Sequence, residues 1–175
     1  MRIDEIEGIG PANGAKLSGA GIETTEALLE RGATAAGRRT LAEATGISET
    51  AILEWVNHAD LMRIDGVGSE YSDLLEAAGV DSPAELAQRN SAALAITFQE
   101  VVAARPAVVR RIPSETEVAG WIAQAQALPK VVSHGGLNDP PEADQGTAVA
   151  ARAATAEGGS GTGLWARIKR LFGGS

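Results

Sequence analysis

The sequence repeats itself at an offset of 58 residues, and this repeat limits the fold more than any other feature of the chain. The stretch LMRIDGVGSEYSDLLEAAGVDSPAELAQRN, residues 61–90, falls on the segment from Ile6 to Gly32. The matched positions are Gly8 with Gly66, Gly10 with Gly68, Leu17 with Leu75, Gly21 with Gly79, Ile22 with Val80, Thr24 with Ser82, Leu28 with Leu86, Arg31 with Arg89 and Gly32 with Asn90. We therefore expect two similar units that pack around a pseudo-twofold axis, each burying a face that it cannot bury alone.

Each copy begins with a turn of the form apolar-Gly-apolar-Gly, and a helix follows it. In the second copy, Tyr71, Leu74, Leu75 and Ala78 fall on one face of that helix. Gly79 comes just after the last of them and suits the left-handed conformation that ends many helices. The pattern therefore predicts a helix, a turn and a second helix, in which the two glycines of the first turn let the chain reverse.

A further helix follows at once in each copy. Ser82, Pro83 and Glu85 have the spacing of an N-cap, a first-turn proline and a capping box. We expect this helix to end in a left-handed cap at Gly32 in the first copy and at Asn90 in the second, since these residue types tolerate that conformation best.

The later part of the copies also corresponds, once about eight extra residues are allowed in the second copy between Phe98 and Val109. The matched positions are Ser48 with Ser114, Thr50 with Thr116, Trp55 with Trp121 and Val56 with Ile122. Both serines are predicted N-caps, with Glu117 completing a capping box in the second copy and Ile47 packing on Ile52 in the first. We interpret Trp55 and Trp121 as equivalent core residues.

Composition agrees with a helical protein. Aromatic residues make up only 3% of the chain, whereas Ala and Leu dominate its apolar 44%, which disfavours a sheet. We predict an all-α fold in which tandem repeats, about 1–60 and 61–132, form one compact helical domain. The chain has no cysteine, so disulfides, thiolate nucleophiles and cysteine zinc sites are excluded.

Enzyme chemistry finds little support in the sequence. The two histidines, His58 and His134, fall on the helix of Trp55 and after the repeats, so they do not predict a metal site or a Ser-His-Asp set. We expect His58 to lie at the surface or to be hydrogen bonded, and we expect no catalytic residue, cofactor or metal. The acidic N-terminus and the lack of a long apolar run predict a cytoplasmic protein. A net charge of −8 disfavours general nucleic-acid binding.

The repeat pattern stops after Pro129, and the remaining chain has a different composition. Residues 133–163 are rich in Gly, Pro, Ala and small polar residues, which predicts a flexible linker. Residues 164–175 then form a predicted basic amphipathic helix. Its apolar side holds Leu164, Trp165, Ile168, Leu171 and Phe172, and its polar side holds Arg167, Lys169 and Arg170.

The paired turns resemble the DNA-binding helix-hairpin-helix superfamily, and the segment from Ile3 to Val132 resembles a bacterial tandem helix-hairpin-helix family that carries only a domain-of-unknown-function label. The motifs are LMRIDGVGSEYSDLLEAAGVDSPAELAQRN and RRIPSETEVAGWIAQAQALP. In DNA-binding relatives the glycine turn offers backbone amides to a phosphate. Carried over, the resemblance implies phosphate-binding residues Gly8, Gly10, Lys16, Gly66 and Gly68.

The charges beside these turns oppose that role. The acidic residues that flank the two turns are Asp4, Glu5, Glu7, Asp65, Glu70 and Asp73. Like charges about 4 Å apart repel by roughly 1 kcal/mol even in bulk water. We therefore rank DNA binding through the glycine turns as the alternative function.

The tail carries a resemblance of its own. The sequence IKRLFGG, residues 168–174, resembles the C-terminal membrane-targeting helix of the bacterial Min-system ATPase. Short amphipathic helices behind Gly- and Pro-rich linkers also resemble the encapsulation peptides that dock cargo onto protein shells. A disordered end, or a helix that folds back on the acidic domain, is the third reading.

Together these patterns predict a non-enzymatic helical adaptor or scaffold that binds a protein partner, with oligomerisation as a further option. The tail would dock it on an anionic membrane or a protein shell, which places it at the inner face of the membrane or inside a protein compartment. The alternative is a DNA-binding protein that contacts phosphates through the two glycine turns.

We predict that the tail binds anionic liposomes reversibly and that binding weakens as salt rises. Burial of its five apolar side chains and attraction of three basic ones to the lipid are offset by the entropy of ordering the helix, so one tail should hold only marginally. Sedimentation with liposomes measures this, with the chain lacking residues 164–175 as the control. Equal binding to neutral lipid, or retained binding in a Trp165→Glu, Ile168→Glu variant, contradicts it.

Overall fold

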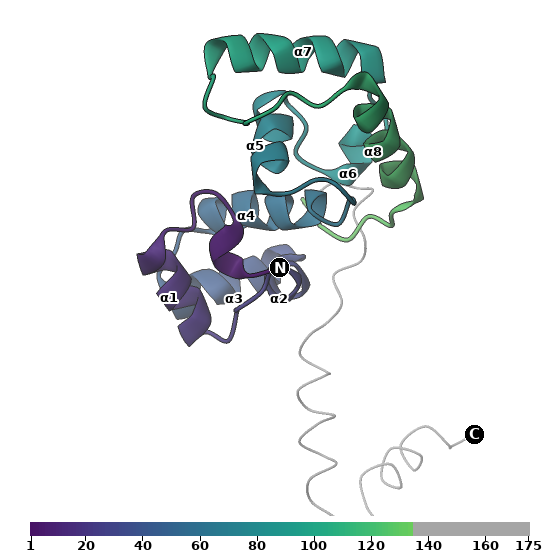
Figure 1. Ribbon diagram of the computed structural model, residues 1–175. Helices are drawn as coiled ribbons and strands as arrows, with labels where there is room; N and C mark the ends of the chain where they lie inside the picture. The colour runs from purple at the N-terminus through teal and green to yellow at the C-terminus, as the bar shows by residue number, and fades with distance from the viewer. Residues whose placement is uncertain (135–175) are drawn as a thin grey trace, which may run out of the picture. The chain divides into compact units, whose positions relative to one another are not determined.

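The computed structural model describes residues 1–134, in which one helix follows another along the chain (Figure 1). A short 3-10 helix, η1 (Ile3–Glu5), comes first. The α-helices are α1 (Pro11–Gly19), α2 (Thr25–Gly32), α3 (Ala35–Thr45), α4 (Glu49–Leu61), α5 (Ser69–Ala77), α6 (Pro83–Leu86), α7 (Ser91–Ala104) and α8 (Glu115–Ala127). No strand occurs within these 134 residues, so the predicted all-α fold is confirmed. The predicted C-terminal helix lies outside the described residues, and so does the predicted linker except for its first two residues, 133 and 134.

Side-chain caps start most of the helices. At six N-caps a side-chain oxygen accepts a hydrogen bond from the backbone N–H three residues later: Thr24, Thr34, Ser48, Ser82, Asn90 and Ser114. The predicted capping box at Ser114 is confirmed, because its N–H donates to the Glu117 carboxylate over 2.8 Å. The box predicted at Ser82 is only half formed, since Glu85 accepts the N–H of Asp81 instead.

Of the three left-handed helix caps predicted from the sequence, the one at Gly79 is correct and those at Gly32 and Asn90 are wrong. Gly79 adopts φ +76° after α5, and Val80 donates its N–H back to Leu75 over 2.9 Å, as expected for a left-handed cap. Gly32, by contrast, is the last residue of α2 but does not adopt the left-handed conformation, and a Cβ there would come within 2.5 Å of Val56 on α4. Glycine there allows two helices to approach closely. Asn90 does not form a left-handed cap either, because it is the N-cap of α7.

The apolar side chains form two separate clusters, one in each half of the described chain. The first core is built from Ile3, Ile6, Ile9, Leu17, Ile22, Leu28, Leu41, Ile47, Ile52, Trp55, Val56, Ala59 and Val132. The second core is built from Leu61, Ile64, Val67, Leu74, Leu75, Val80, Leu86, Leu94, Phe98, Val109, Val118, Trp121, Ile122 and Ala125. Each half therefore buries its own apolar face, and the shared core that we expected is not formed. The two tryptophans are buried in equivalent places, as predicted.

Residues 129–134, which we call the return segment, bring the chain back from α8 to the first half. Val132 belongs to the first core, and the N–H of Ser133 donates to Ala33 over 2.8 Å. Arg38 is only 6% exposed and donates both to the carbonyl of Gly32, over 3.0 Å, and to that of Ser133, over 2.8 Å. The folded domain therefore extends past Val132, the end that we predicted from the sequence.

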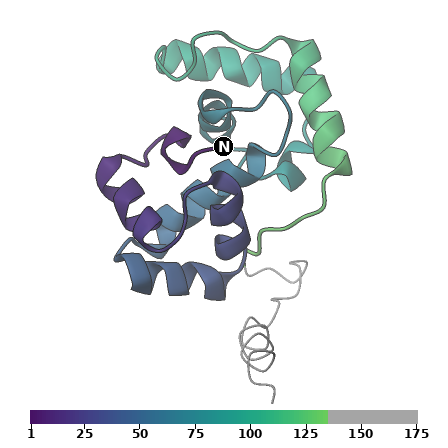
Figure 2. The same cartoon turned by 60° about the horizontal axis from the view of Figure 1, so that its bottom comes forward.

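The halves also meet at the glycine turns. The N–H of Glu7, in the first turn, donates over 3.0 Å to the Ser69 hydroxyl at the start of α5. Figure 2 shows the purple and blue first half beside the teal and green second half, with α4 running between them. No helix among residues 1–134 has both the length and the apolar character needed to cross a bilayer.

We predict that Trp55→Ala and Trp121→Ala each lower the free energy of unfolding by about 3 to 5 kcal/mol, the range for large buried aromatic side chains. Urea denaturation followed by circular dichroism measures the change, and Trp→Phe variants extend the comparison if an alanine variant does not fold. Ile96→Ala is the control, because Ile96 is 58% exposed and should change stability by less than about 0.5 kcal/mol. Equal stability of the wild type and both tryptophan variants would show that these residues do not anchor the cores.

Candidate functional site

The first glycine of each turn lies against the tryptophan of its own half. Gly8 and Gly66 adopt φ +83° and φ +89°, which L-residues rarely adopt. A Cβ added at Gly8 would lie 3.3 Å from Trp55 Nε1, and one at Gly66 would lie 3.1 Å from Trp121 Nε1. These two positions therefore require glycine both for the backbone and for the close approach of the indole ring.

The second glycine of each turn has no such requirement. Gly10 and Gly68 are the N-caps of α1 and α5, with extended backbones at φ −69° and φ −101°, and an added Cβ would meet nothing within 4 Å. Neither α1 nor α5 has a side-chain cap. The backbone N–H groups at the starts of α1 and α5 are thus the groups that a phosphate would meet, as the resemblance to DNA-binding helix-hairpin-helix proteins implies.

The charges that a phosphate would need are not brought to these amides. Lys16 is exposed in the last turn of α1, about 7 to 8 Å along the helix axis from its first residue. On α5, the Glu70 carboxylate lies in the first turn, where it accepts the N–H of Arg110 over 3.2 Å and pairs with its Nε over 3.0 Å. The first turn of α5 thus lies beside a carboxylate that is already paired with Arg110.

A cluster that the sequence did not predict joins α4 to α5. His58, only 5% exposed, places its Nε2 atom 2.8 Å from Glu76 and its Nδ1 atom 3.4 Å from Asp73. Burial raises the pKa of Asp73 to about 6, with His58 opposing the shift and Glu7 and Glu76 adding to it. His58 is hydrogen bonded, as expected from the sequence. It lies between the two halves of the domain, which the sequence did not predict. The two carboxylates are i and i+3 on one helix, which is the only signal that the sequence offered.

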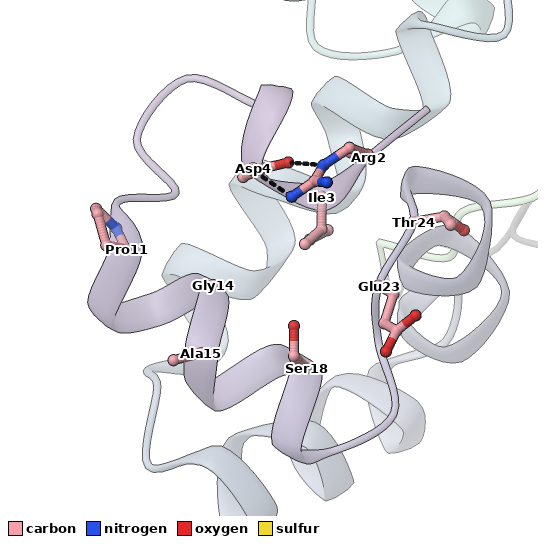
Figure 3. Close-up of a pocket in the computed structure, with 9 residues that line it drawn as sticks. All are labelled: Arg2, Ile3, Asp4, Pro11, Gly14, Ala15, Ser18, Glu23 and Thr24. Atoms are coloured by element: carbon pink, nitrogen blue, oxygen red, sulfur yellow. Dashed lines mark hydrogen bonds and ion pairs between the residues drawn. The ribbon is translucent and has the colours of Figure 1, made fainter.

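Two open pockets lie beside these features. One, of about 880 Å³, borders the cluster and is lined by Glu7, Glu70, Asp73, Glu76, Ala77, Arg105, Ala107, Val108 and Arg110. The other, of about 520 Å³, lies between η1, α1 and the segment before α2 (Figure 3). Figure 3 shows the Arg2–Asp4 ion pair on one side of it and Ser18 with Glu23 on the other. Among the residues that line these two pockets, no hydroxyl lies beside a histidine that could activate it.

The outer face of α7 is unusually poor in charge. Leu94 and Phe98 bury the inner face in the second core. The exposed residues are Ala92, Ala93, Ile96, Gln99, Glu100, Ala103 and Ala104. An outer helix face normally carries several charges, whereas this one has a single carboxylate and an isoleucine that is 58% exposed. The run SAALAITFQEVVAA, whose exposed polar residues are Gln99 and Glu100 alone, is the signal that the sequence offers for this face.

The comparisons with known proteins identify one family. A family model described as "Domain of unknown function (DUF4332)" matches residues 7–128. No curated protein and no solved structure gives a significant match to the chain.

We predict opposite outcomes for one substitution at the two glycines of the second turn. Gly66→Ser should lower the free energy of unfolding by at least about 1 to 2 kcal/mol, because the left-handed backbone and the nearby indole both disfavour a side chain. Gly68→Ser should be neutral or slightly stabilising, because serine is a good N-cap and has open space there. Thermal and urea unfolding of the two variants test this, and equal destabilisation by both would contradict it.

Proposed function

Because the chain belongs to the family described as Domain of unknown function (DUF4332), we propose its function from the structure and the sequence together. We propose that it is a non-enzymatic adaptor: the helical domain binds a partner protein, and the basic tail docks on an anionic membrane or a protein shell. In this proposal the two glycine turns are helix-hairpin-helix units that serve the architecture of the domain.

The observation that carries the proposal is the outer face of α7 around Ile96. This face is solvent exposed and apolar, and neither core uses it. Its small side chains allow another helix to approach closely, and Ile96 offers a central apolar anchor of the kind found at interfaces. Figure 1 shows α7 at the edge of the second half, packed on α5 and α8, where its other side is accessible.

The charge of the protein indicates which kind of helix would bind there. The chain carries a net charge of −8, and acidic residues Glu100 and Glu115 lie on α7 and at the start of α8. The Glu115 carboxylate also accepts a hydrogen bond from Ser91, the first residue of α7. We therefore assign as partner an amphipathic helix with an apolar face and basic flanks, which these carboxylates attract.

The tail gives the adaptor its second contact. Since one tail is expected to hold only marginally, stable docking requires several copies, either through oligomerisation or on a clustered target. This proposal places the protein in the cytoplasm, at the inner face of the membrane or inside a protein compartment.

DNA binding is the alternative, and the uncapped first turns of α1 and α5 favour it. The distance of Lys16 from those amides and the carboxylates around both turns speak against it. Affinity for duplex DNA tighter than micromolar at about 150 mM salt would reverse this ranking.

We predict that a photo-reactive benzoylphenylalanine at position 96 cross-links a specific partner in the cells that make this protein, whereas the same group at Glu43, an exposed position on α3, does not. The captured protein is then purified and its binding measured by calorimetry. Ile96→Asp should weaken binding by about tenfold or more, as expected for a central interface residue.

The matched control is Ala44→Asp, which adds the same charge at an exposed site on α3. It should leave the affinity unchanged. If the purified protein binds wild type and Ile96→Asp equally, or if position 96 gives no adduct beyond that at position 43, α7 is not the docking surface.

A further inference from the structure

His58, Asp73 and Glu76 bring an imidazole and two carboxylates together at the joint between the halves. His58 lies in the last turn of α4. Asp73 and Glu76 lie three residues apart on α5, so both carboxylates are on the side of α5 that faces α4. One possible metal-ligand atom from each residue lies within 4.8 Å of the corresponding atoms of the other two. The three residues therefore already form a compact group of metal-binding side chains.

The orientation of the imidazole leaves one nitrogen without a partner. A carboxylate accepts hydrogen bonds only, so the 2.8 Å contact with Glu76 places the ring hydrogen on Nε2. In the neutral form of that tautomer Nδ1 carries a lone pair. It is buried and has no hydrogen-bond partner within the described part of the chain. Buried polar atoms are rarely left unpaired, because desolvation without a compensating bond is costly.

The atom that faces this lone pair is itself an acceptor. Asp73 Oδ1 lies 3.4 Å from Nδ1, and when the imidazole is neutral two electron-rich atoms face each other across a gap that holds no hydrogen bond. Two ligands of one zinc ion, each about 2.0 to 2.2 Å from the metal at tetrahedral angles, lie about 3.4 Å apart. The spacing of Nδ1 and Oδ1 thus suits a cation between them.

The surrounding charges also favour a cation. Glu7 adds negative potential at Asp73, and Glu70 lines the same pocket. Arg110 neutralises Glu70, while the other arginine of the pocket, Arg105, follows the end of α7. The side-chain exposure rises from 6% at His58 to 20% at Asp73 and 44% at Glu76, so the cluster opens by steps into the pocket of about 880 Å³. Asp73 lines this pocket and is reached from solvent, while Nδ1 lies buried 3.4 Å from its Oδ1.

We propose that this cluster is a binding site for a divalent transition-metal ion of the zinc and cobalt class. His58 Nδ1 and Asp73 bind the ion directly, and Glu76 holds the imidazole in the tautomer that presents Nδ1. A carboxylate on the distal ring nitrogen is the usual support of a metal-binding histidine. The imidazole selects zinc or cobalt over magnesium and calcium, which prefer oxygen ligands. The bound ion ties α4 to α5 and so stabilises the joint between the halves.

The test uses the full chain, freed of metal with a chelator and titrated with ZnCl₂ by calorimetry and with CoCl₂ by visible absorption. We expect one ion per chain and, with Co²⁺, the absorption bands of a low-symmetry site with nitrogen and oxygen ligands. Zinc at about 100 times its dissociation constant should raise the melting temperature by about 5 to 10 °C.

Variants separate this site from other carboxylates of the acidic domain. His58→Gln and Asp73→Asn should abolish the cobalt bands and the heat of zinc binding, whereas Glu76→Gln should weaken binding by about tenfold. Asp65→Asn is the matched control, because it removes the same charge at an exposed position outside the cluster. It should bind as the wild type does, and circular dichroism confirms that each variant is folded.

Two results overturn the proposal. If the wild type binds neither ion, a proton shared by His58 and Asp73 accounts for their geometry and the site is not a metal site. If Asp73→Asn binds as tightly as the wild type, or Asp65→Asn loses binding equally, the ion binds elsewhere on the acidic surface.

Discussion

The contact between a left-handed glycine and a tryptophan ring is the constraint on which each half of the domain depends. Gly8 lies against Trp55, and Gly66 lies against Trp121, with no space for a side chain in between. This contact fixes the turn that precedes α1 or α5 against the last helix of the same half. Since each tryptophan is buried among the aliphatic residues of its core, the turn, the core and the final helix are positioned together.

The joint between the halves is made differently, because the two cores do not merge. Polar contacts connect them: the Glu7 amide with Ser69, and His58 with Asp73 and Glu76. The helix α4 serves both sides, with Trp55 in the first core and Leu61 in the second. The return segment closes the arrangement through the buried Arg38. Such a joint responds to ions and to charge more than an apolar interface does, since its strength rests on electrostatic contacts.

The surfaces that we propose for function lie away from the features that first suggest one. The glycine turns look like a phosphate-binding device, yet their first glycines serve packing against tryptophan and their surroundings are acidic. The outer face of α7 has no such motif, but it carries Ile96, the most exposed large apolar side chain among the described residues. The adaptor that we propose uses this exposed helix, whereas the repeated glycine turns pack against the tryptophans.

The sequence by itself determined the all-α fold, the helix starts at Ser48, Ser82 and Ser114 and the equivalence of the two tryptophans, because caps and the repeat are local or directly comparable along the chain. It misassigned left-handed caps to Gly32 and Asn90, because a glycine that allows close packing and an asparagine that starts a helix have the same residue types as such caps. Only the tertiary structure decided that the cores remain separate, that Arg38 is buried and that His58 meets Asp73 and Glu76. These contacts join residues up to 95 positions apart, and their geometry depends on how whole helices pack.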